Sequence, residues 1–243
     1  MPELEAPARK RLARACFREH AYGLCETAWA WYRLPENFVN HVEVVGSEIL
    51  QSAMREGQGV LLLGAHYSML DLITPMIHAQ AGRFSVSYRP HDNASLNHEI
   101  VRCRSKFVDL VDVRHTREIV RRLCAGQMVW FAFDQDLGLR NSVFAPFFGQ
   151  PACTVITPAR LCAVTGCLPI FVQVSRANFR YRVQFNELPR AYPGDDHVEN
   201  ATQVNALVEL AVREMPAQYM WMHKRFKTRP DGTRGALYSQ PER

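Results

Sequence analysis

The sequence lacks the long apolar run that would predict a membrane-spanning helix. No stretch of about 20 predominantly apolar residues occurs in the chain, and that is the length an α-helix needs to cross the hydrocarbon core. A charged segment followed by a short apolar core and a cleavage site is also missing, so no secretory signal peptide is predicted. We therefore expect no transmembrane segment within these 243 residues.

Cysteine pairing and metal-binding motifs are missing too. The seven Cys are odd in number and include no Cys-x-x-Cys spacing, so we expect reduced thiols rather than a disulfide framework or a zinc site. No zinc-finger spacing, RNP-type motif or internal repeat occurs, which argues against nucleic acid as a partner. The net charge of +5 still favours an acidic partner, such as an anionic membrane face, phosphate groups or an acidic protein.

Strand-like and helix-like segments alternate along the middle of the chain. Strands are predicted at 41–46, 59–65, 84–90, 107–113 and 127–134, with a late hairpin of 168–176 and 180–188. Helices are predicted within 2–34 and at 47–57, 72–82, 94–107, 116–126, 156–165 and 197–214. This order predicts one α/β domain over residues 1–243, with a mixed, mostly parallel sheet flanked by helices. Its ends, 1–8 and 233–243, are expected to be flexible.

The first long helix combines an apolar stripe with a basic first half. Apolar residues recur at steps of three and four, at Phe17, Ala21, Leu24, Ala28 and Trp31. Basic residues crowd the first half, at Arg9, Lys10, Arg11, Arg14 and Arg18. Two interpretations stay open: a packed helix with a solvated basic turn, or a basic collar that faces anionic headgroups.

The segment "GVLLLGAHYSMLDL", residues 59–72, changes from apolar to polar within three residues. This pattern predicts a buried strand followed by His66, with Asp71 near the first turn of the next helix. Sites in open α/β sheets form where strands end and lead into helices. A carboxylate at Asp71 would hold the imidazole of His66 in one tautomer and leave its other nitrogen free as a general base. The alternative interpretation is a buried histidine whose ring nitrogens have hydrogen-bond partners and a purely structural role.

The loop "DQDLGLRNSVF" places Asp134 and Asp136 at the end of another predicted strand. Two nearby carboxylates bind a cation or share a proton, but we favour one that orients an arginine such as Arg140 and one that faces solvent. Ser142 belongs to the same loop and is a candidate to line an acceptor cleft.

Three further arginines are candidates for binding an anionic group. Arg89 lies at the end of one predicted strand, Arg114 comes at the end of another, and Arg104 lies in the helix between them. A guanidinium fork binds phosphate through two parallel hydrogen bonds, and it also suits an oxyanion. A surface position or a structural ion pair is the alternative for each of them.

Two more segments have unusual composition. The predicted loop 144–152, "FAPFFGQPA", is apolar, and Phe144, Phe147 and Phe148 are either core residues or part of an acyl-chain slot or membrane-facing lip. The C-terminal region gathers potential cations at His223, Lys224, Arg225, Lys227 and Arg229. They form either a solvated charge run or a contact with an anionic partner. His223 has no acidic neighbour in sequence and is not predicted to be catalytic.

Four segments, "GVLLLGAHYSMLDL", "YRPHDNASL", "DQDLGLRNSVFAPFFGQPACTV" and "QYMWMHKRFKTRPDG", occur in this order. Together they resemble the late acyltransferases of lipid A biosynthesis, the HtrB-like group within the glycerolipid acyltransferase superfamily. The resemblance covers about residues 7–232. It implies an acyltransferase-like α/β fold and an enzyme that moves a fatty acyl chain onto a hydroxyl.

The resemblance also implies the substrates and the site. The donor is a thioester of acyl carrier protein, less often of coenzyme A, and no metal or cofactor is expected. The acceptor is a hydroxyl of a lipid A precursor, a phosphorylated glucosamine disaccharide. His66 and Asp71 match the family's catalytic pair, Arg104 is the favoured arginine although Cys103 replaces the usual Gly, and either Asp134 or Asp136 matches a required acidic residue.

The chain also departs from the family at its N-terminal end. Relatives typically begin with a membrane-spanning helix, whereas this sequence starts inside the helix that follows it. We therefore expect peripheral attachment to the cytoplasmic face of the cell inner membrane, through the basic residues at 9–18 and apolar loops. Two alternatives stay open: an acyltransferase that uses a lysophospholipid or another hydroxylated lipid, and a non-catalytic protein that binds anionic lipids.

Overall fold

The main sheet of the computed structural model has the strand order β1-β9-β8-β2-β5-β3-β4. The structure describes residues 1, 3–235 and 238, and within them this sheet has seven strands. The strands are β1 (Val42–Val45), β2 (Val60–Gly64), β3 (Phe84–Tyr88), β4 (Val108–Asp112), β5 (Met128–Ala132), β8 (Leu168–Ala177) and β9 (Arg180–Glu187). All neighbouring pairs are parallel except β8 with β9. The predicted mixed, mostly parallel sheet is confirmed.

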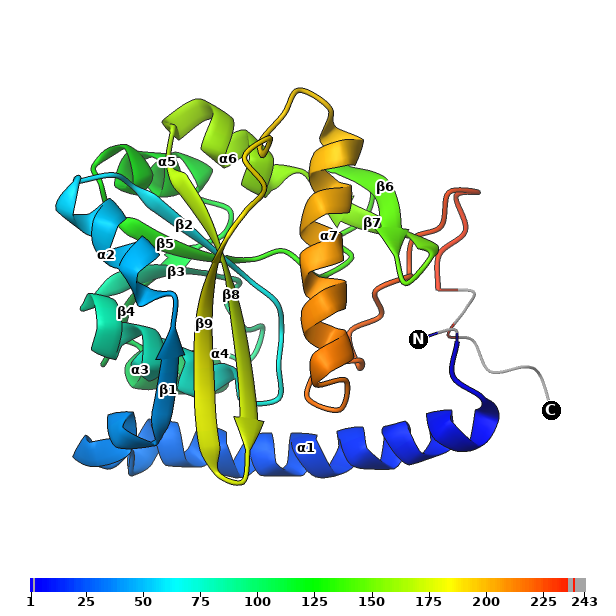
Figure 1. The fold of residues 1–243 in the computed structure, drawn as a ribbon, viewed down its shortest axis with the longest axis horizontal. Coiled ribbons are helices and arrows are strands. Elements are labelled where there is room, and N and C mark those ends of the chain that lie inside the picture. Colours follow the sequence, from blue (N-terminus) through cyan, green and yellow to red (C-terminus); the bar gives the residue numbers. More distant parts are fainter. Residues whose placement is uncertain (2, 236–237, 239–243) are drawn as a thin grey trace.

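Helices cover both faces of this sheet (Figure 1). They are α1 (Ala6–Tyr32), α2 (Ser47–Arg55), α3 (Leu70–Ala81), α4 (Ala94–Arg104), α5 (Thr116–Cys124), α6 (Thr157–Thr165) and α7 (His197–Glu214), with a 3₁₀ turn η1 (Glu36–His41). The long α1 packs on α3 and α4, while α5 packs on α6. Every residue of β2 is buried, as expected for a central parallel strand with helices on both sides.

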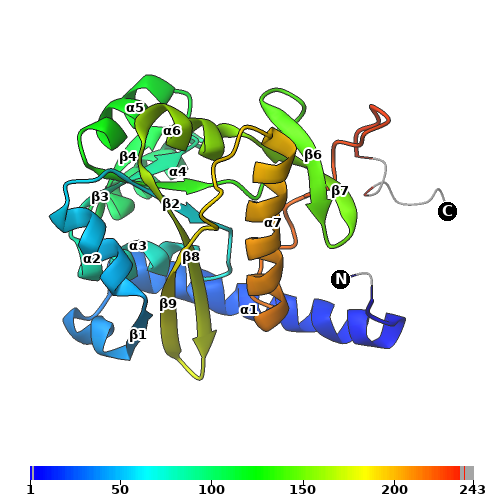
Figure 2. The same ribbon diagram turned by 45° about the horizontal axis from the view of Figure 1, so that its top comes forward.

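The prediction of a loop at 144–152 is wrong, because this region belongs to a second, two-stranded sheet. Strands β6 (Ser142–Phe147) and β7 (Gln150–Val155) pair in antiparallel register. Phe148 and Gly149 join them with φ angles of 50° and 71°, the positive values that a tight two-residue hairpin turn requires. The hairpin packs against α7 (Figure 2). Phe147 and Phe148 are buried there, which favours the core interpretation, and Phe144 is half-buried.

Most of the apolar stripe of α1 is exposed, although Trp31 at its end is half-buried against the core. The side chains of Phe17 and Leu24 are 80% and 74% exposed. The buried residues of α1 are Gly23, Glu26 and Ala30. A Cβ on Gly23 would lie 2.1 Å from the carbonyl oxygen of Ser68, so the helix sits directly on the loop after β2.

A polar network turns this other face of α1 inward. Arg176 on β8 forms ion pairs with Glu19 and Glu26, and the hydroxyl of Tyr181 donates to Glu26 at 2.7 Å. Buried charges require such partners. The network therefore helps to fix which face of the helix meets the domain, and Phe17 and Leu24 are left on the outer face.

Three other predictions concern the ends of the chain, the thiols and the membrane. Helix α1 already begins at Ala6, so the expected flexible segment 1–8 overlaps a helix, and much of 233–243 lies outside the described residues. All seven cysteines are free. Among the described residues, each helix is too short or too polar to cross a membrane.

Candidate active site

The site lies at the carboxyl ends of β2 and β5, which are neighbours in the sheet. Gly64 pairs with Ala132 in the parallel register, so His66 and Asp134 each lie two residues beyond a paired strand end. Nδ1 of His66 is 2.6 Å from Oδ1 of Asp134, and the backbone N–H of His66 donates to Oδ2 at 2.9 Å. One carboxylate therefore holds both the ring and the backbone of His66.

The two groups shift each other's ionisation. Burial opposes the charge on Asp134, but the proximity and hydrogen bonds of His66 outweigh it and bring the pKa of this carboxyl to about 2. Burial also works against a charged His66, yet the carboxylate of Asp134 raises the pKa of the ring above its ordinary value. Asp134 is thus an anion at neutral pH that favours the protonated form of the imidazole.

A close contact beneath the site positions the end of β2. A Cβ on Gly64 would lie 1.9 Å from Cζ2 of Trp130 on β5, so only glycine leaves room for the indole. The loop that follows β2 is held from the other side by the C-terminal segment. The backbone N–H of Ser68 donates to the carbonyl of Gln218 at 2.7 Å, and that of Met220 donates to the carbonyl of His66 at 3.0 Å.

Asp71 does not supply the carboxylate on His66, and this corrects the predicted contact. Its Oδ1 accepts from Nε of Arg104 at 2.7 Å, and its Oδ2 accepts from the hydroxyl of Thr27 on α1 at 3.3 Å. Asp71 lies in the first turn of α3, which points it towards α4 rather than towards β5. The structure therefore assigns Asp134 to His66 and Asp71 to Arg104, while a role for Asp71 in the reaction stays a prediction.

A cleft of about 340 Å³ opens beside the ring of His66. Apolar side chains form most of its wall, including Leu70, Ile73, Phe84, Val86 and Trp130. Arg104, Arg89 and Gln135 add polar groups to the lining. Arg104 is largely buried through its contact with Asp71, whereas Arg89 is exposed and lies 3.8 Å from Asp92. Two of the three predicted arginines therefore share this cleft with His66.

Asp136 holds the chain in place rather than facing solvent. It is buried, its Oδ2 accepts from the backbone N–H of Thr228 at 2.6 Å, and its Oδ1 accepts from the hydroxyl of the same residue at 2.8 Å. It thereby ties the C-terminal segment to the loop after β5. Arg140 is exposed and forms no ion pair with Asp134 or Asp136 among the described residues, so the predicted arrangement of this loop is wrong.

The remaining candidates lie apart from the cleft. Arg114 is exposed and pairs with Asp112. Ser142 begins β6, and its hydroxyl is 3.5 Å from the carbonyl oxygen of Arg140. Arg225 is buried and donates to the carbonyl of Cys153 at 2.6 Å, so one member of the C-terminal charge run is a structural residue.

His223, which was not predicted to be catalytic because it lacks an acidic neighbour in sequence, lies at the site. Its ring meets that of His66 edge to face, with the centroids 4.6 Å apart. Burial and the nearby His66 lower the pKa of His223 below its ordinary value. His66, Asp134 and His223 offer potential metal-ligating atoms within 4.8 Å of one another, although both oxygens of Asp134 already accept from His66. The sequence does not show that His223 lies near His66, because the C-terminal segment contacts the loop after β2 only in the folded chain.

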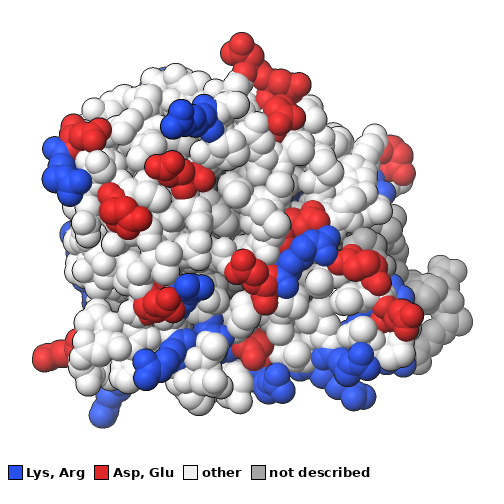
Figure 3. Space-filling model, in the orientation of Figure 1, with Lys and Arg blue, Asp and Glu red and all other residues white. Residues whose placement is uncertain are grey.

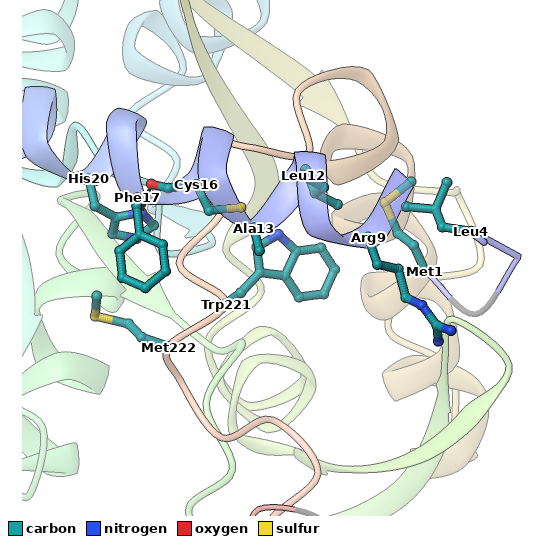
Figure 4. A pocket seen from close by; sticks show the side chains of 10 residues that line it. All are labelled: Met1, Leu4, Arg9, Leu12, Ala13, Cys16, Phe17, His20, Trp221 and Met222. Carbon is teal, nitrogen blue, oxygen red and sulfur yellow. Dashed lines mark hydrogen bonds between the residues drawn. The ribbon is translucent and has the colours of Figure 1, made fainter. Parts of the chain in front are cut away.

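A second cavity, of about 400 Å³, lies between the first half of α1 and the C-terminal segment. Figure 4 shows Leu12, Cys16 and Phe17 on the helix facing Trp221 and Met222. This cavity is mostly apolar, with Arg9 at one end (Figure 4). Met222 directly precedes His223, so this cavity borders the segment that carries His223.

The family model and the similar proteins found by comparison agree on one family. Residues 1–228 match the family model described as "Bacterial lipid A biosynthesis acyltransferase". The lipid A biosynthesis lauroyltransferase of Escherichia coli (strain K12) is 32% identical over 236 residues, which cover 95% of this chain and 76% of the relative. The palmitoleoyltransferase of the same strain is 31% identical over 237 residues, covering 95% and 76%. A lipid A biosynthesis acyltransferase of Haemophilus influenzae is 28% identical, covering 98% and 77%.

The match extends over nearly the whole chain and includes the strands, the loops and the C-terminal segment that build the site. It confirms the resemblance seen in the four sequence segments, and it places the chain among acyl-transferring enzymes rather than non-catalytic lipid-binding proteins. The chain belongs to the bacterial lipid A biosynthesis acyltransferase family.

Proposed function

We propose that this protein transfers a fatty acyl chain from a thioester of acyl carrier protein to a hydroxyl of a lipid A precursor, with Nε2 of His66 as the general base. The observation that carries the proposal is the position of His66. Its Nδ1 is engaged by Asp134 at 2.6 Å, while the ring borders the cleft. This arrangement fixes the tautomer that leaves Nε2 able to accept a proton.

The proposed reaction is a direct transfer. The acceptor hydroxyl loses its proton to Nε2 of His66 as its oxygen attacks the thioester carbonyl carbon. The tetrahedral intermediate then collapses, the carbon–sulfur bond breaks, and the carrier thiolate takes the proton from His66. Asp134 stabilises the imidazolium between these steps, and general-base catalysis of this kind contributes roughly 10²–10⁴-fold. No cofactor is needed, because the thioester is already activated.

The cleft suits an amphipathic acceptor. Its apolar wall of Ile73, Phe84 and Val86 fits a hydrocarbon chain. Arg104 and Arg89 line the same cleft, and a guanidinium is well suited to phosphate. Asp71 engages only Nε of Arg104, which leaves the two Nη groups available for an anionic substrate group. These features favour a phosphorylated lipid over a neutral one.

Attachment to the cytoplasmic face of the inner membrane is part of the proposal. Figure 3 shows several Lys and Arg side chains along the edge of the molecule where α1 lies in Figure 1. Exposed Phe17 and Leu24 belong to the same helix, and Phe179, at the turn between β8 and β9, is 73% exposed beside Tyr22. Apolar side chains next to basic ones are typical of a surface that lies in a membrane interface.

The test uses the purified chain with lipid A precursor and acyl carrier protein loaded with a labelled acyl chain. We expect transfer by the wild type and a loss of roughly 10²–10⁴-fold in kcat for His66→Ala with the fold intact. Equal rates for the two proteins would refute the mechanism. A matched variant is His41→Ala, which alters an exposed histidine on the far edge of the sheet and is expected to keep full activity.

The substrates are tested in the same assay. Replacing the carrier thioester with a coenzyme A thioester measures donor preference, and we expect the carrier form to have the higher kcat/KM. Replacing the lipid A precursor with a lysophospholipid tests the alternative acceptor class. Faster transfer to the lysophospholipid would contradict the proposed acceptor without contradicting the role of His66.

A further inference from the structure

The side-chain amide of Gln135 lies between two imidazole rings. Its Nε2 is 3.5 Å from Nε2 of His66. The same atom is 3.2 Å from Nδ1 and 3.3 Å from Nε2 of His223. Gln135 directly follows Asp134 and also lines the cleft. Its amide is therefore in contact with both histidines and accessible to a molecule bound in the cleft.

His223 is suited to hold this amide. Burial and the neighbouring His66 lower the pKa of His223, so its ring is neutral at neutral pH and has one unprotonated nitrogen that accepts a hydrogen bond. The amide of Gln135 carries two N–H groups. When one of them donates to His223, the other remains for a second acceptor, and the amide nitrogen that carries it is 3.5 Å from Nε2 of His66.

The transfer step needs a donor at this place. As the hydroxyl oxygen attacks the thioester, the electron pair of the C=O π bond moves onto the carbonyl oxygen, which becomes an oxyanion. A preorganised N–H group near that oxygen stabilises the transition state. Among the described residues, Gln135 supplies the polar side-chain contact to Nε2 of His66, where the attacking hydroxyl must bind. In the proposed reaction the Nη groups of Arg104 bind the anionic group of the acceptor while its Nε stays on Asp71, so the oxyanion needs another donor.

We infer that Gln135 donates a hydrogen bond to the carbonyl oxygen of the thioester as it becomes an oxyanion, and that His223 is a positioning residue which orients the Gln135 amide. The inference rests on the proposed acyl transfer and adds two residues to its site. When the intermediate collapses, the oxygen's electron pair re-forms the carbonyl bond of the new ester, and the hydrogen bond to Gln135 weakens again.

The first experiment removes the donor without adding charge. Gln135→Met keeps the length of the side chain and loses both N–H groups, and we expect kcat to fall about 10²–10³-fold with a smaller change in the KM for the thioester. Gln135→Asn keeps an amide on a shorter side chain, and we expect its kcat to lie between those of the wild type and Gln135→Met. The matched control is Gln127→Met, an exposed glutamine at the other end of β5. A kcat for Gln135→Met within threefold of wild type would overturn the inference.

The second experiment asks whether His223 acts through Gln135. His223→Phe keeps a ring against His66 and removes the acceptor, and we expect kcat to fall about tenfold, as for a weakened single hydrogen bond. The double variant with Gln135→Met should be no slower than Gln135→Met alone, because residues that act as a unit are not additive. Fully additive losses would overturn the positioning role. ¹⁵N NMR of the Gln135 amide adds an independent readout, since its shift should move in His223→Phe and stay unchanged in His41→Phe.

The outcomes separate this inference from the proposed function. Wild-type turnover that depends on His66 but is unaffected by Gln135→Met refutes only the donor role. Absence of turnover in the wild type refutes both proposals. Thermal unfolding of each variant shows whether it has folded. Where Gln135→Met has not, Gln135→Leu, which also lacks the amide, decides: wild-type kcat refutes the donor role and a lowered kcat supports it.

Discussion

The ring of His66 and the carboxylate of Asp134 lie 2.6 Å apart, although 68 residues separate them in the chain. The contact follows from the pairing of β2 with β5, which brings two strand ends together and makes their trailing loops neighbours. The same carboxylate also accepts the backbone N–H of His66. This double contact restricts the ring more firmly than a side-chain hydrogen bond alone.

Asp134→Asn is expected to change both the rate and its pH dependence. Only neutral His66 can accept the proton, so kcat/KM rises with pH through the pKa of His66, which Asp134 holds above its ordinary value. Removing the carboxylate leaves burial as the larger influence and moves this acid limb to lower pH. The plateau should fall roughly 10²–10⁴-fold because the imidazolium loses its stabilising charge. A pH–rate profile of both proteins measures this, and an unmoved limb would contradict the pairing.

Asp71 and Arg104 are expected to act together on acceptor binding. Asp71→Asn should leave the acid limb in place, because its carboxylate contacts Arg104 at 2.7 Å rather than His66. It should raise the KM for the phosphorylated acceptor more than the KM for the acyl thioester, and the loss should be coupled to that of Arg104→Met by roughly 0.5–3 kcal/mol. Steady-state kinetics of the double-mutant cycle tests this. A shifted acid limb in Asp71→Asn would instead support the predicted His66–Asp71 pair.

Gly64→Ala is expected to disturb the site through Trp130. The added Cβ would lie 1.9 Å from the indole, so the end of β2 or the ring must shift, at a cost of about 1–3 kcal/mol in the free energy of unfolding. Because His66 is two residues further on, kcat should fall as well. Urea unfolding and turnover measure the two effects. Adding Trp130→Leu should recover part of the lost stability, and no recovery would place the strain elsewhere.

Arg225→Met is expected to destabilise the fold rather than weaken substrate binding. Arg225 donates to the carbonyl of Cys153 and to the side chains of Thr154 and Asn205, at 2.6–3.0 Å. Loss of these bonds leaves buried acceptors without a partner, at a cost of about 2–4 kcal/mol. Lys224→Met, next to it but exposed, should stay within about 0.5 kcal/mol of wild type. Equal unfolding midpoints for both variants would refute the structural role.

The exposed face of α1 is expected to bind anionic membranes. Phe17→Ser with Leu24→Ser should raise the Kd for vesicles of phosphatidylglycerol and phosphatidylcholine at least tenfold, since insertion of each side chain is worth about 1.5–3 kcal/mol. Added salt should weaken wild-type binding, because the basic residues of the helix contribute. Vesicle flotation measures this. Leu210→Ser, on an equally exposed site of α7, is the control, and an equal loss there would refute a specific role for α1.

Patterns within short segments of the sequence predicted much of the fold and part of the site. The apolar run of β2 and the abrupt change at Gly64 placed His66 at a strand end, and the alternation of strands and helices predicted the sheet, because both depend on burial within a few neighbouring residues. The motif "DQDLG" was placed at a strand end in the same way. Which of Asp134 and Asp136 faces His66 could not be read from it, since that depends on the order and register of strands far apart in the chain.

Packing between distant parts of the chain determined the partners of His66 and the orientation of α1. The pairing of β2 with β5 assigned Asp134 to His66 and left Asp71 to Arg104, and the return of the C-terminal segment to the loop after β2 brought His223 against the site. Phe17 and Leu24 of the apolar stripe of α1 face outward, because Glu19 and Glu26 of the same helix form ion pairs with Arg176 on the side that meets the domain. Sequence periodicity shows that a helix has two faces. The partners that each face meets are set by the sum of many weak contacts across the fold, which no single segment contains.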